Sequence, residues 1–272
     1  MKRLSLNVVL GGAIIGTVVV GAVLGAVWTP YDPLKIDFVG RLAPPGASHW
    51  LGTDEFGRDV LSRLMAAAAT SMLISLSTVA AAGLLGTAVG LVSGYLRGWT
   101  DRILMAFNDA LLAFPAILLA LGLLTVAGAN SYGIIVALGL AYTPSVARIV
   151  RGTVLSLRER EFVEASRVMG NSELYTVLRH ILPNCVGPMI VLATSMFGWV
   201  LLAESALSFL GLGVPPPAPT WGNMLAASRP FIAQAVWLAI FPGFCISLTL
   251  LGINLLGDAL RDRLDPRMRG AS

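Results

Sequence analysis

The chain has 272 residues, of which 56% are hydrophobic and 12% are charged, and its mean hydropathy is +0.79. Soluble globular proteins carry about 25% charged residues, so this composition excludes an ordinary soluble domain and indicates an integral membrane protein. The net charge of +4 does not indicate nucleic-acid binding, because the 19 basic residues follow a topological pattern described below. Cys185 and Cys245 lie far apart in the sequence and predict neither a disulfide framework nor a metal site.

Six apolar runs are long enough to cross a membrane. The first follows Lys2 and Arg3, and it exceeds the apolar region of a signal peptide, about 7–15 residues, so we expect an uncleaved span. The predicted spans are residues 4–28, 68–96, 103–126, 133–150, 186–210 and 235–256. The sequence therefore predicts an all-α polytopic membrane protein with six transmembrane helices. We divide it into residues 1–67, with the first span and an amphipathic segment, and residues 68–272, with the other five spans.

The basic residues divide unequally between the two sides of this topology. If the amino terminus lies inside, five basic residues face outward: Lys35, Arg41, Arg58, Arg63 and Arg229. The other fourteen face inward: Lys2, Arg3, Arg97, Arg102, Arg148, Arg151, Arg158, Arg160, Arg167, Arg179, Arg261, Arg263, Arg267 and Arg269. Cytoplasmic loops are enriched in Lys and Arg, so we expect both termini and the loop of residues 151–185 to be cytoplasmic.

The two outer loops contain distinct patterns. In residues 49–65, Thr53 is placed to cap an amphipathic helix in which Asp54 pairs with Arg58, and Asp59 with Arg63, at i, i+4. This helix is either structural or a contact for a delivered substrate or its carrier. The second loop, residues 211–234, is rich in proline, which predicts a rigid lip with Trp221 near the membrane interface.

Small and charged residues inside the spans indicate close packing and internal partners. Gly86, Gly90 and Gly94 form overlapping GxxxG patterns, which we interpret as packing within the chain. A carboxylate inside a membrane costs roughly 2.5–3.5 kcal/mol even on insertion scales, so Asp109 and Glu204 should face the protein interior. For Asp109 we expect a structural partner, such as an arginine of the inner loops. For Glu204 two interpretations stay open: a structural role, or a position in a translocation path.

The most polar stretch between spans runs from Arg158 to Asn184, and we call it the knob. Its first half predicts a helix with one apolar or small face, formed by Phe162, Ala165, Ser166 and Met169. Gly170 stands where a helix ends in a left-handed residue. Ser172 is placed to cap a second helix, with Glu173 in its first turn, and Pro183 is predicted to end it.

Several kinds of chemistry are missing from the sequence. It contains no GxxxxGK[ST] pattern, so the chain is not expected to bind ATP through a P-loop. It contains no HExxH pattern, and His49 and His180 are its only histidines. No base stands at membrane depth to activate a serine, and Asp109 and Glu204 are predicted on opposite sides of the bilayer. We therefore expect a non-catalytic protein without a metal site or cofactor of its own.

The knob resembles the EAA motif of the permease subunits of bacterial ATP-binding cassette (ABC) importers. Glu164, Ala165, Gly170, Leu182 and Pro183 match that motif, and Ser166 replaces its second alanine. Four further stretches are similar to the second permease subunit of dipeptide, oligopeptide and nickel importers. They are HWLGTDEFGRDVLSRL, GYLRGWTDRILMAFNDALLAFP, ESALSFLGLGVPPPAPTWGNM and NLLGDALRDRLDPR. The similarity covers the chain from Tyr31 onward, in order.

The resemblance implies the type I ABC importer permease fold in the bacterial inner membrane, surrounded by lipid. It implies a heterodimer with a homologous permease subunit, two ABC ATPase subunits that bind ATP and Mg²⁺, and an extracytoplasmic substrate-binding protein. In the knob, Glu164 would supply polar contacts to an ATPase groove, while Ala165 and Ser166 would allow close approach. Gly170 would make the turn, and Leu182 and Pro183 would set the exit into the fifth span.

The resemblance leaves alternatives open. A nickel or metal-chelate importer uses the same fold as a peptide importer, so the spans and the knob do not separate the two. A self-contained secondary transporter would require charges at membrane depth and inverted repeats, and neither is clear in the sequence. A membrane enzyme is disfavoured by the missing catalytic residues.

Overall fold

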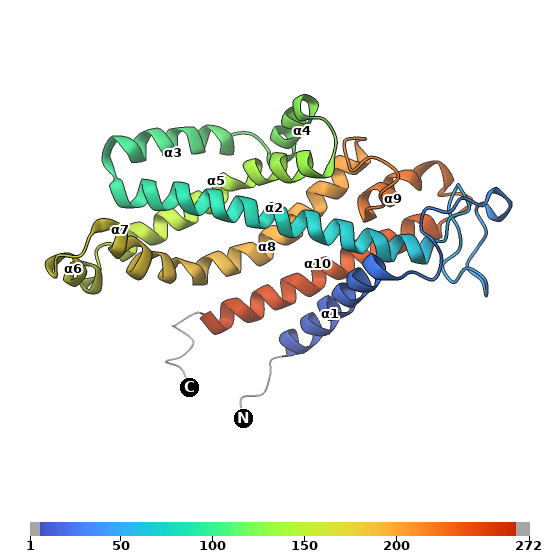
Figure 1. The fold of residues 1–272 in the computed structure, drawn as a ribbon, viewed down its shortest axis with the longest axis horizontal. Coiled ribbons are helices and arrows are strands. Elements are labelled where there is room, and N and C mark those ends of the chain that lie inside the picture. The colour runs from blue at the N-terminus through green and yellow to red at the C-terminus, as the bar shows by residue number, and fades with distance from the viewer. Residues whose placement is uncertain (1–5, 265–272) are drawn as a thin grey trace.

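The computed structural model describes residues 6–264, a helical bundle elongated along the axes of its longest helices (Figure 1). Lys2, Arg3, Arg267 and Arg269, which contribute to the predicted charge asymmetry, lie outside these residues. The α-helices are α1 (Leu6–Val27), α2 (Val60–Leu96), α3 (Gly98–Leu112), α4 (Ala116–Ala127), α5 (Ser131–Leu157), α6 (Glu161–Val168), α7 (Glu173–Thr176), α8 (Leu182–Phe209), α9 (Trp221–Ala227) and α10 (Trp237–Leu264). Short 3₁₀ turns cover Phe38–Gly40 and Arg229–Phe231, and Val177–Ile181 form a π turn.

Five helices are long and apolar enough to cross a membrane on their own: Leu6–Val27, Val60–Leu96, Ser131–Leu157, Glu173–Phe209 and Trp237–Asp262. They confirm the first, second, fourth, fifth and sixth predicted spans. The third was expected to be one helix, but it consists of α3 and α4, which meet at an angle of 92°. Pro115 explains the break, because it has no N–H to donate and disfavours helical backbone at Phe114.

The second span begins earlier than expected. Thr53 does not cap a helix, and residues 53–59 form an irregular turn closed by an antiparallel bridge between Thr53 and Asp59. Gly57 has a φ of +74°, a left-handed conformation that interrupts any helix at this point. Asp59 is the true N-cap, because its side chain accepts a hydrogen bond from the Ser62 N–H. The expected division of the chain at residue 67 therefore falls inside α2.

The helix after Ser172 also differs from its prediction. Pro183 does not end it, and the helical backbone continues from α7 through the π turn into α8. The Leu182 N–H bonds to the Val177 carbonyl, five residues back, so the wider turn precedes the proline. Pro183 directly follows this wider turn, as the second residue of α8.

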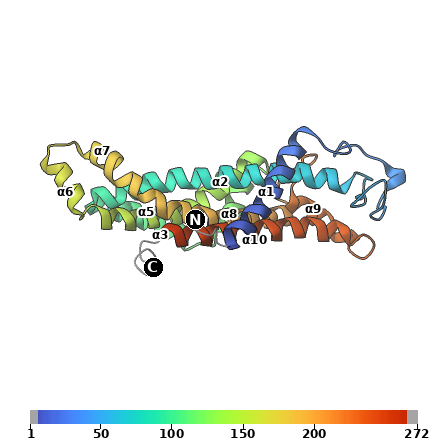
Figure 2. The same ribbon diagram turned by 90° about the horizontal axis from the view of Figure 1, so that it is seen from below.

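Glycines set the closest helix contacts in the bundle. Gly86, Gly90 and Gly94 lie on the face of α2 that packs against α5, which confirms packing within the chain. A Cβ atom added at Gly90 would come within 2.7 Å of the Ala147 carbonyl oxygen. Gly11 of α1 lies against Gly252 of α10 in the same manner. These contacts hold α2 on α5 and α1 on α10 (Figures 1 and 2).

The bundle has two different ends. One end carries α6 and α7, and we call it the knob end; the other carries residues 28–59 and α9, and we call it the loop end (Figures 1 and 2). Trp221, expected near the membrane interface, is 2% exposed and donates from its indole to the Leu64 carbonyl at 3.2 Å. Trp221 therefore fastens the second outer loop to α2 within the protein core.

Candidate functional site

The knob lies beyond the ends of the long helices, at the extreme of the molecule (Figure 2). Its first helix, α6, ends in the turn that the sequence predicts. Gly170 has a φ of +79°, its N–H bonds to the Arg167 carbonyl at 2.9 Å, and the Asn171 N–H bonds to the Ser166 carbonyl at 3.2 Å. This is the two-bond glycine cap that ends many helices. An added Cβ at Gly170 would meet no atom within 4 Å, so the requirement for glycine comes from the backbone angle alone.

The second helix of the knob begins as expected. The Ser172 hydroxyl accepts a hydrogen bond from the Tyr175 N–H at 3.2 Å, and Glu173 lies in the first turn. A carboxylate there interacts favourably with the positive end of the helix dipole. The two helices and the glycine turn therefore form a defined helix-turn-helix.

Ser166 is the main departure from the predicted site. It was expected on the outer surface with Ala165, but it is fully buried, and its hydroxyl lies 2.9 Å from that of Thr176. The Asn171 side chain donates to the same Ser166 oxygen at 3.2 Å. The inner face of α6 is formed by Val163 and Ser166, three residues apart, whereas the other members of the predicted stripe, Phe162, Ala165 and Met169, are exposed. Ser166 holds the knob together from within.

The outer surface of the knob is unusually apolar. Six large hydrophobic side chains are exposed on it, up to 83% for Val168: Phe162, Val168, Met169, Leu174, Tyr175 and Leu178. Glu164 and Ala165 are exposed on α6. Pro183 is exposed at the start of α8, next to the half-buried Leu182. Exposed apolar side chains rimmed by polar ones mark interaction surfaces. Five of the six predicted coupling residues thus retain exposed surface.

The base of the knob is fixed to the end of α2 by a tyrosine that sequence analysis missed. Arg158 donates to the Tyr95 carbonyl at 2.7 Å, and Arg167 donates to the Tyr95 hydroxyl at 3.1 Å. Both guanidinium groups also lie over the Tyr95 ring, within 6 Å of its centre. Burial, together with nearby arginines, lowers the pKa of Arg158. A single tyrosine at the end of an apolar run carries no signal for this role.

Two ion pairs join α3 to α5. Arg151 binds Asp101 through two hydrogen bonds of 2.6 and 2.7 Å. The expected partner of Asp109 is Arg148 of α5, at 2.6 Å, and both side chains are about 60% exposed. The prediction of an arginine partner for Asp109 is therefore confirmed, although Arg148 belongs to a span rather than a loop.

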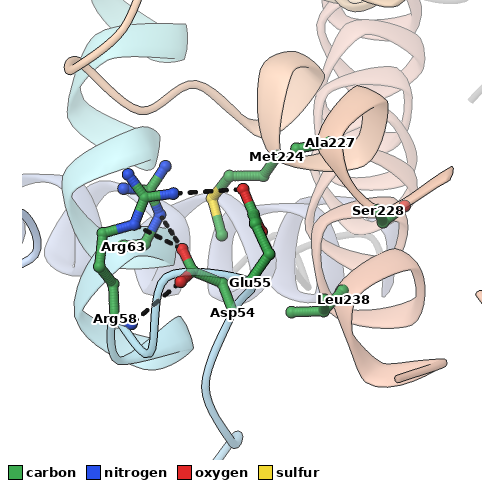
Figure 3. Close-up of a pocket in the computed structure, with 8 residues that line it drawn as sticks. All are labelled: Asp54, Glu55, Arg58, Arg63, Met224, Ala227, Ser228 and Leu238. Atoms are coloured by element: carbon green, nitrogen blue, oxygen red, sulfur yellow. Dashed lines mark hydrogen bonds and ion pairs between the residues drawn. The ribbon is translucent and has the colours of Figure 1, made fainter. Parts of the chain in front are cut away.

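A cluster of charges lies at the loop end, between the first outer loop, α9 and α10 (Figure 3). Asp54 binds Arg58 at 2.7 Å, as predicted, and it also binds Arg63 at 3.3 Å. Glu55 lies 3.4 Å from Arg58, and burial, the largest effect, raises the pKa of its carboxyl. The predicted pair of Asp59 and Arg63 does not form, because Asp59 caps α2 and Arg63 turns towards Asp54.

Asp59 instead joins the first outer loop to the start of α2. Its carboxylate accepts hydrogen bonds from the Ser62 N–H at 2.8 Å and from the Ser62 hydroxyl at 2.7 Å. His49 lies 2.9 Å from the other oxygen of the same carboxylate. The first outer loop is therefore tied to the start of α2 by buried polar contacts, which matches the structural interpretation of this segment.

Glu204 is fully buried between α8 and the second outer loop. One of its oxygens accepts from the Ser208 hydroxyl at 2.9 Å and from the Thr220 hydroxyl at 3.0 Å. Thr220 in turn caps α9 through a reciprocal pair of hydrogen bonds with Asn223. Glu204 has no exposed surface in this chain, and its position in a translocation path stays a prediction.

Comparisons with known proteins agree with the geometry. Residues 86–270 match the model of a family described as the binding-protein-dependent transport system inner membrane component. A peptide transport system permease protein of Brucella suis is 43% identical over 269 residues, covering 99% of this chain and 90% of the relative. A dipeptide transport system permease protein of Alkalihalophilus pseudofirmus is 40% identical over 98% of this chain and 89% of the relative. A glutathione transport system permease protein of Pectobacterium atrosepticum is 40% identical over 88% of this chain and 80% of the relative.

Solved structures show the same fold at low sequence identity. A chain from inward-facing structures of the MetNI methionine ABC transporter aligns with a TM-score of 0.58 at 17% identity, covering 72% of this chain and 93% of that one. A chain of an amino acid ABC transporter aligns with a TM-score of 0.54 at 14% identity, covering 71% and 90%. The fold, the matched family model and the relatives lead to one conclusion. The chain belongs to the family of inner membrane components of binding-protein-dependent transport systems.

Proposed function

We propose that this chain is one permease subunit of an ATP-driven peptide importer, where it forms half of the translocation pathway and couples it to separate ATPase subunits. The observation that carries the proposal is the knob: a rigid helix-turn-helix with an exposed apolar surface, continuous in backbone with a membrane-spanning helix. Such an element transfers a movement of its docking partner to the membrane region. The relatives named above transport peptides, a dipeptide and glutathione, and they give no support to the nickel alternative.

The proposed assembly has four kinds of component. A homologous permease subunit pairs with this chain, two ABC ATPase subunits bind the knobs and supply ATP and Mg²⁺, and an extracytoplasmic binding protein delivers the peptide. The chain itself is non-catalytic. It lies in the bacterial inner membrane with both termini and the knob in the cytoplasm, an orientation supported by the excess of basic residues in the inner segments of the predicted topology.

Within the knob, the proposal assigns separate tasks to the motif residues. Glu164 and Ala165 contact the ATPase groove, because both are exposed on the first helix. Gly170 maintains the turn through its left-handed backbone. Leu182 and Pro183 lie where the knob passes into α8, so they set the angle of that exit.

A glycine substitution series tests the coupling role. Replacing Gly170 by leucine strains a left-handed backbone, at a cost of about 1–2 kcal/mol, and should uncouple ATP hydrolysis from uptake in proteoliposomes that contain all partner subunits. Asparagine tolerates that conformation, so Gly170→Asn should retain more uptake than Gly170→Leu. Gly152 of α5 is the matched control, because an added Cβ there also meets nothing within 4 Å and its φ is not positive.

The results separate clearly. Normal membrane insertion with retained ATPase activity and lost peptide uptake in Gly170→Leu, beside normal uptake in Gly152→Leu, supports coupling through the knob. Normal uptake in Gly170→Leu contradicts it. Failure of the unsubstituted complex to accumulate any peptide contradicts the importer function as a whole.

A further inference from the structure

The ion pair of Asp109 and Arg148 lies at a depth where charges are costly. α5 has 27 residues and is about 40 Å long, roughly 10 Å more than the hydrocarbon core of a bilayer. Arg148 stands nine residues before its end, about 14 Å along the helix, which is further than the overhang. Asp109 stands three residues before the end of α3, in the middle of the broken span. Both groups therefore lie within the membrane region.

The pair is nevertheless exposed in this chain. The side chains of Arg148 and Asp109 are 59% and 61% exposed, and a single hydrogen bond of 2.6 Å joins them. The neighbouring pair of Arg151 and Asp101 is different, because it is 31% and 16% exposed and is joined by two bonds. The Arg151–Asp101 pair holds α3 on α5. In the Arg148–Asp109 pair, most of the guanidinium and one carboxylate oxygen have no partner among the described residues.

The backbone beside Asp109 is also irregular. Residues 113–115 are non-helical and exposed where the span bends by 92°. Pro144 lies in α5 one turn before Arg148, and its carbonyl accepts a hydrogen bond from Asn108 at 3.3 Å. Irregular backbone at membrane depth is tolerated only inside protein or beside a water-filled cavity, and charges there mark substrate pathways. Broken helices in transporters have the same association.

We propose that Asp109 and Arg148 line the water-filled translocation pathway and bind the charged termini of the passing peptide. Every unmodified linear peptide carries a terminal carboxylate and a terminal ammonium group whatever its sequence, and the pair offers one counter-charge to each. Arg148 takes the carboxylate, which guanidinium groups bind through two parallel hydrogen bonds, and Asp109 takes the ammonium. Arg148 and Asp109 bind each other when no peptide is present. This inference rests on the proposed importer function and adds the site at which the substrate is recognised.

Cysteine accessibility tests whether this face meets water and peptide. In the assembled transporter in proteoliposomes, with Cys185 and Cys245 replaced by alanine, we would introduce Ala106→Cys or Ser145→Cys, each one turn from the pair and leaving it intact. A membrane-impermeant, anionic methanethiosulfonate reagent should modify both variants, and a transported dipeptide should slow the reaction. Leu84→Cys is the control: Leu84 is 75% exposed on α2 among apolar neighbours with no charged residue beside it, so this cysteine should not react.

Kinetics test the recognition itself. Arg148→Gln and Asp109→Asn should each raise the KM for dipeptide uptake about tenfold, as expected for loss of one charged hydrogen bond, with little change in kcat. Asp101→Asn should lower the amount of assembled transporter without raising the KM. Unreactive Ala106→Cys and Ser145→Cys variants would show that the partner subunit or lipid covers this face and would overturn the inference, as would reaction rates that peptide does not change. Either result would contradict only this inference, because peptide uptake by the parent transporter would still support the importer function.

Discussion

The hydroxyl groups of Ser166 and Thr176 lie 2.9 Å apart inside the knob and link its two helices, and neither side chain is exposed. The link explains how a segment with so little apolar interior keeps a fixed shape. It also means that Ser166, in the position of the second motif alanine, lies inside the knob and not on its outer surface.

We expect Ser166→Ala to loosen the knob by about 1–3 kcal/mol, because it leaves the buried Thr176 hydroxyl without that partner. Adding Thr176→Val removes the unpaired hydroxyl, so the double variant should recover part of the loss. Amide hydrogen exchange of residues 161–176 in the assembled transporter measures both effects. Thr153→Ala is the control, because its exposed hydroxyl bonds only within its own helix. Equal exchange in the single and double variants would contradict the link.

Two glycines of α2 should respond oppositely to alanine. A Cβ at Gly90 would lie 2.7 Å from both the Ala147 carbonyl oxygen and Val150, so Gly90→Ala must push α5 away, at a cost of about 1–3 kcal/mol. A Cβ at Gly83 meets nothing within 4 Å, so Gly83→Ala should be neutral or stabilising by up to about 1 kcal/mol. The apparent unfolding midpoint of the purified transporter in detergent checks both. If the two variants had the same midpoint, the glycine contact would not control the packing of α2 on α5.

The stability of the loop end should depend on Glu55. Burial raises its pKa above the ordinary value of 4.5, so the folded state binds this proton more tightly than the unfolded state does. The contribution of Glu55 is complete below pH 4.5 and is lost as the pH rises through the raised folded value. Glu55→Gln should therefore gain stability relative to the parent between pH 4 and pH 7, which unfolding midpoints across that range would measure. A difference that does not change with pH would show that the carboxyl is not perturbed by burial.

The features of this chain that depend on local chemistry could be predicted from the sequence. Gly170 was identified because a polar helix followed by glycine and a capping serine requires a left-handed residue at that point. The Asp54–Arg58 pair was found for the same reason, since its partners are four residues apart. The long apolar runs gave the membrane spans, because a membrane helix must satisfy its backbone hydrogen bonds within itself.

The features that could not be predicted depend on distant parts of the chain. The direction of Ser166 is decided by where α7 folds back, and the role of Tyr95 is decided by two arginines more than 60 residues away. Pro115 and Pro183 show the limits of a local rule. Both remove a backbone N–H, yet the first breaks a span and the second follows a π turn within a continuous helical run.

The continuity from Glu173 to Phe209 has a mechanical consequence. This run of 37 residues is about 55 Å long, so a tilt of about 5° at the knob would displace its opposite end by about 5 Å. Near that opposite end, Glu204 accepts a hydrogen bond from the hydroxyl of Thr220, the N-cap residue of α9. If an ATPase binds the knob as proposed, a small rotation of the knob moves the opposite end of this helix sideways by about 5 Å, at the loop end of the bundle.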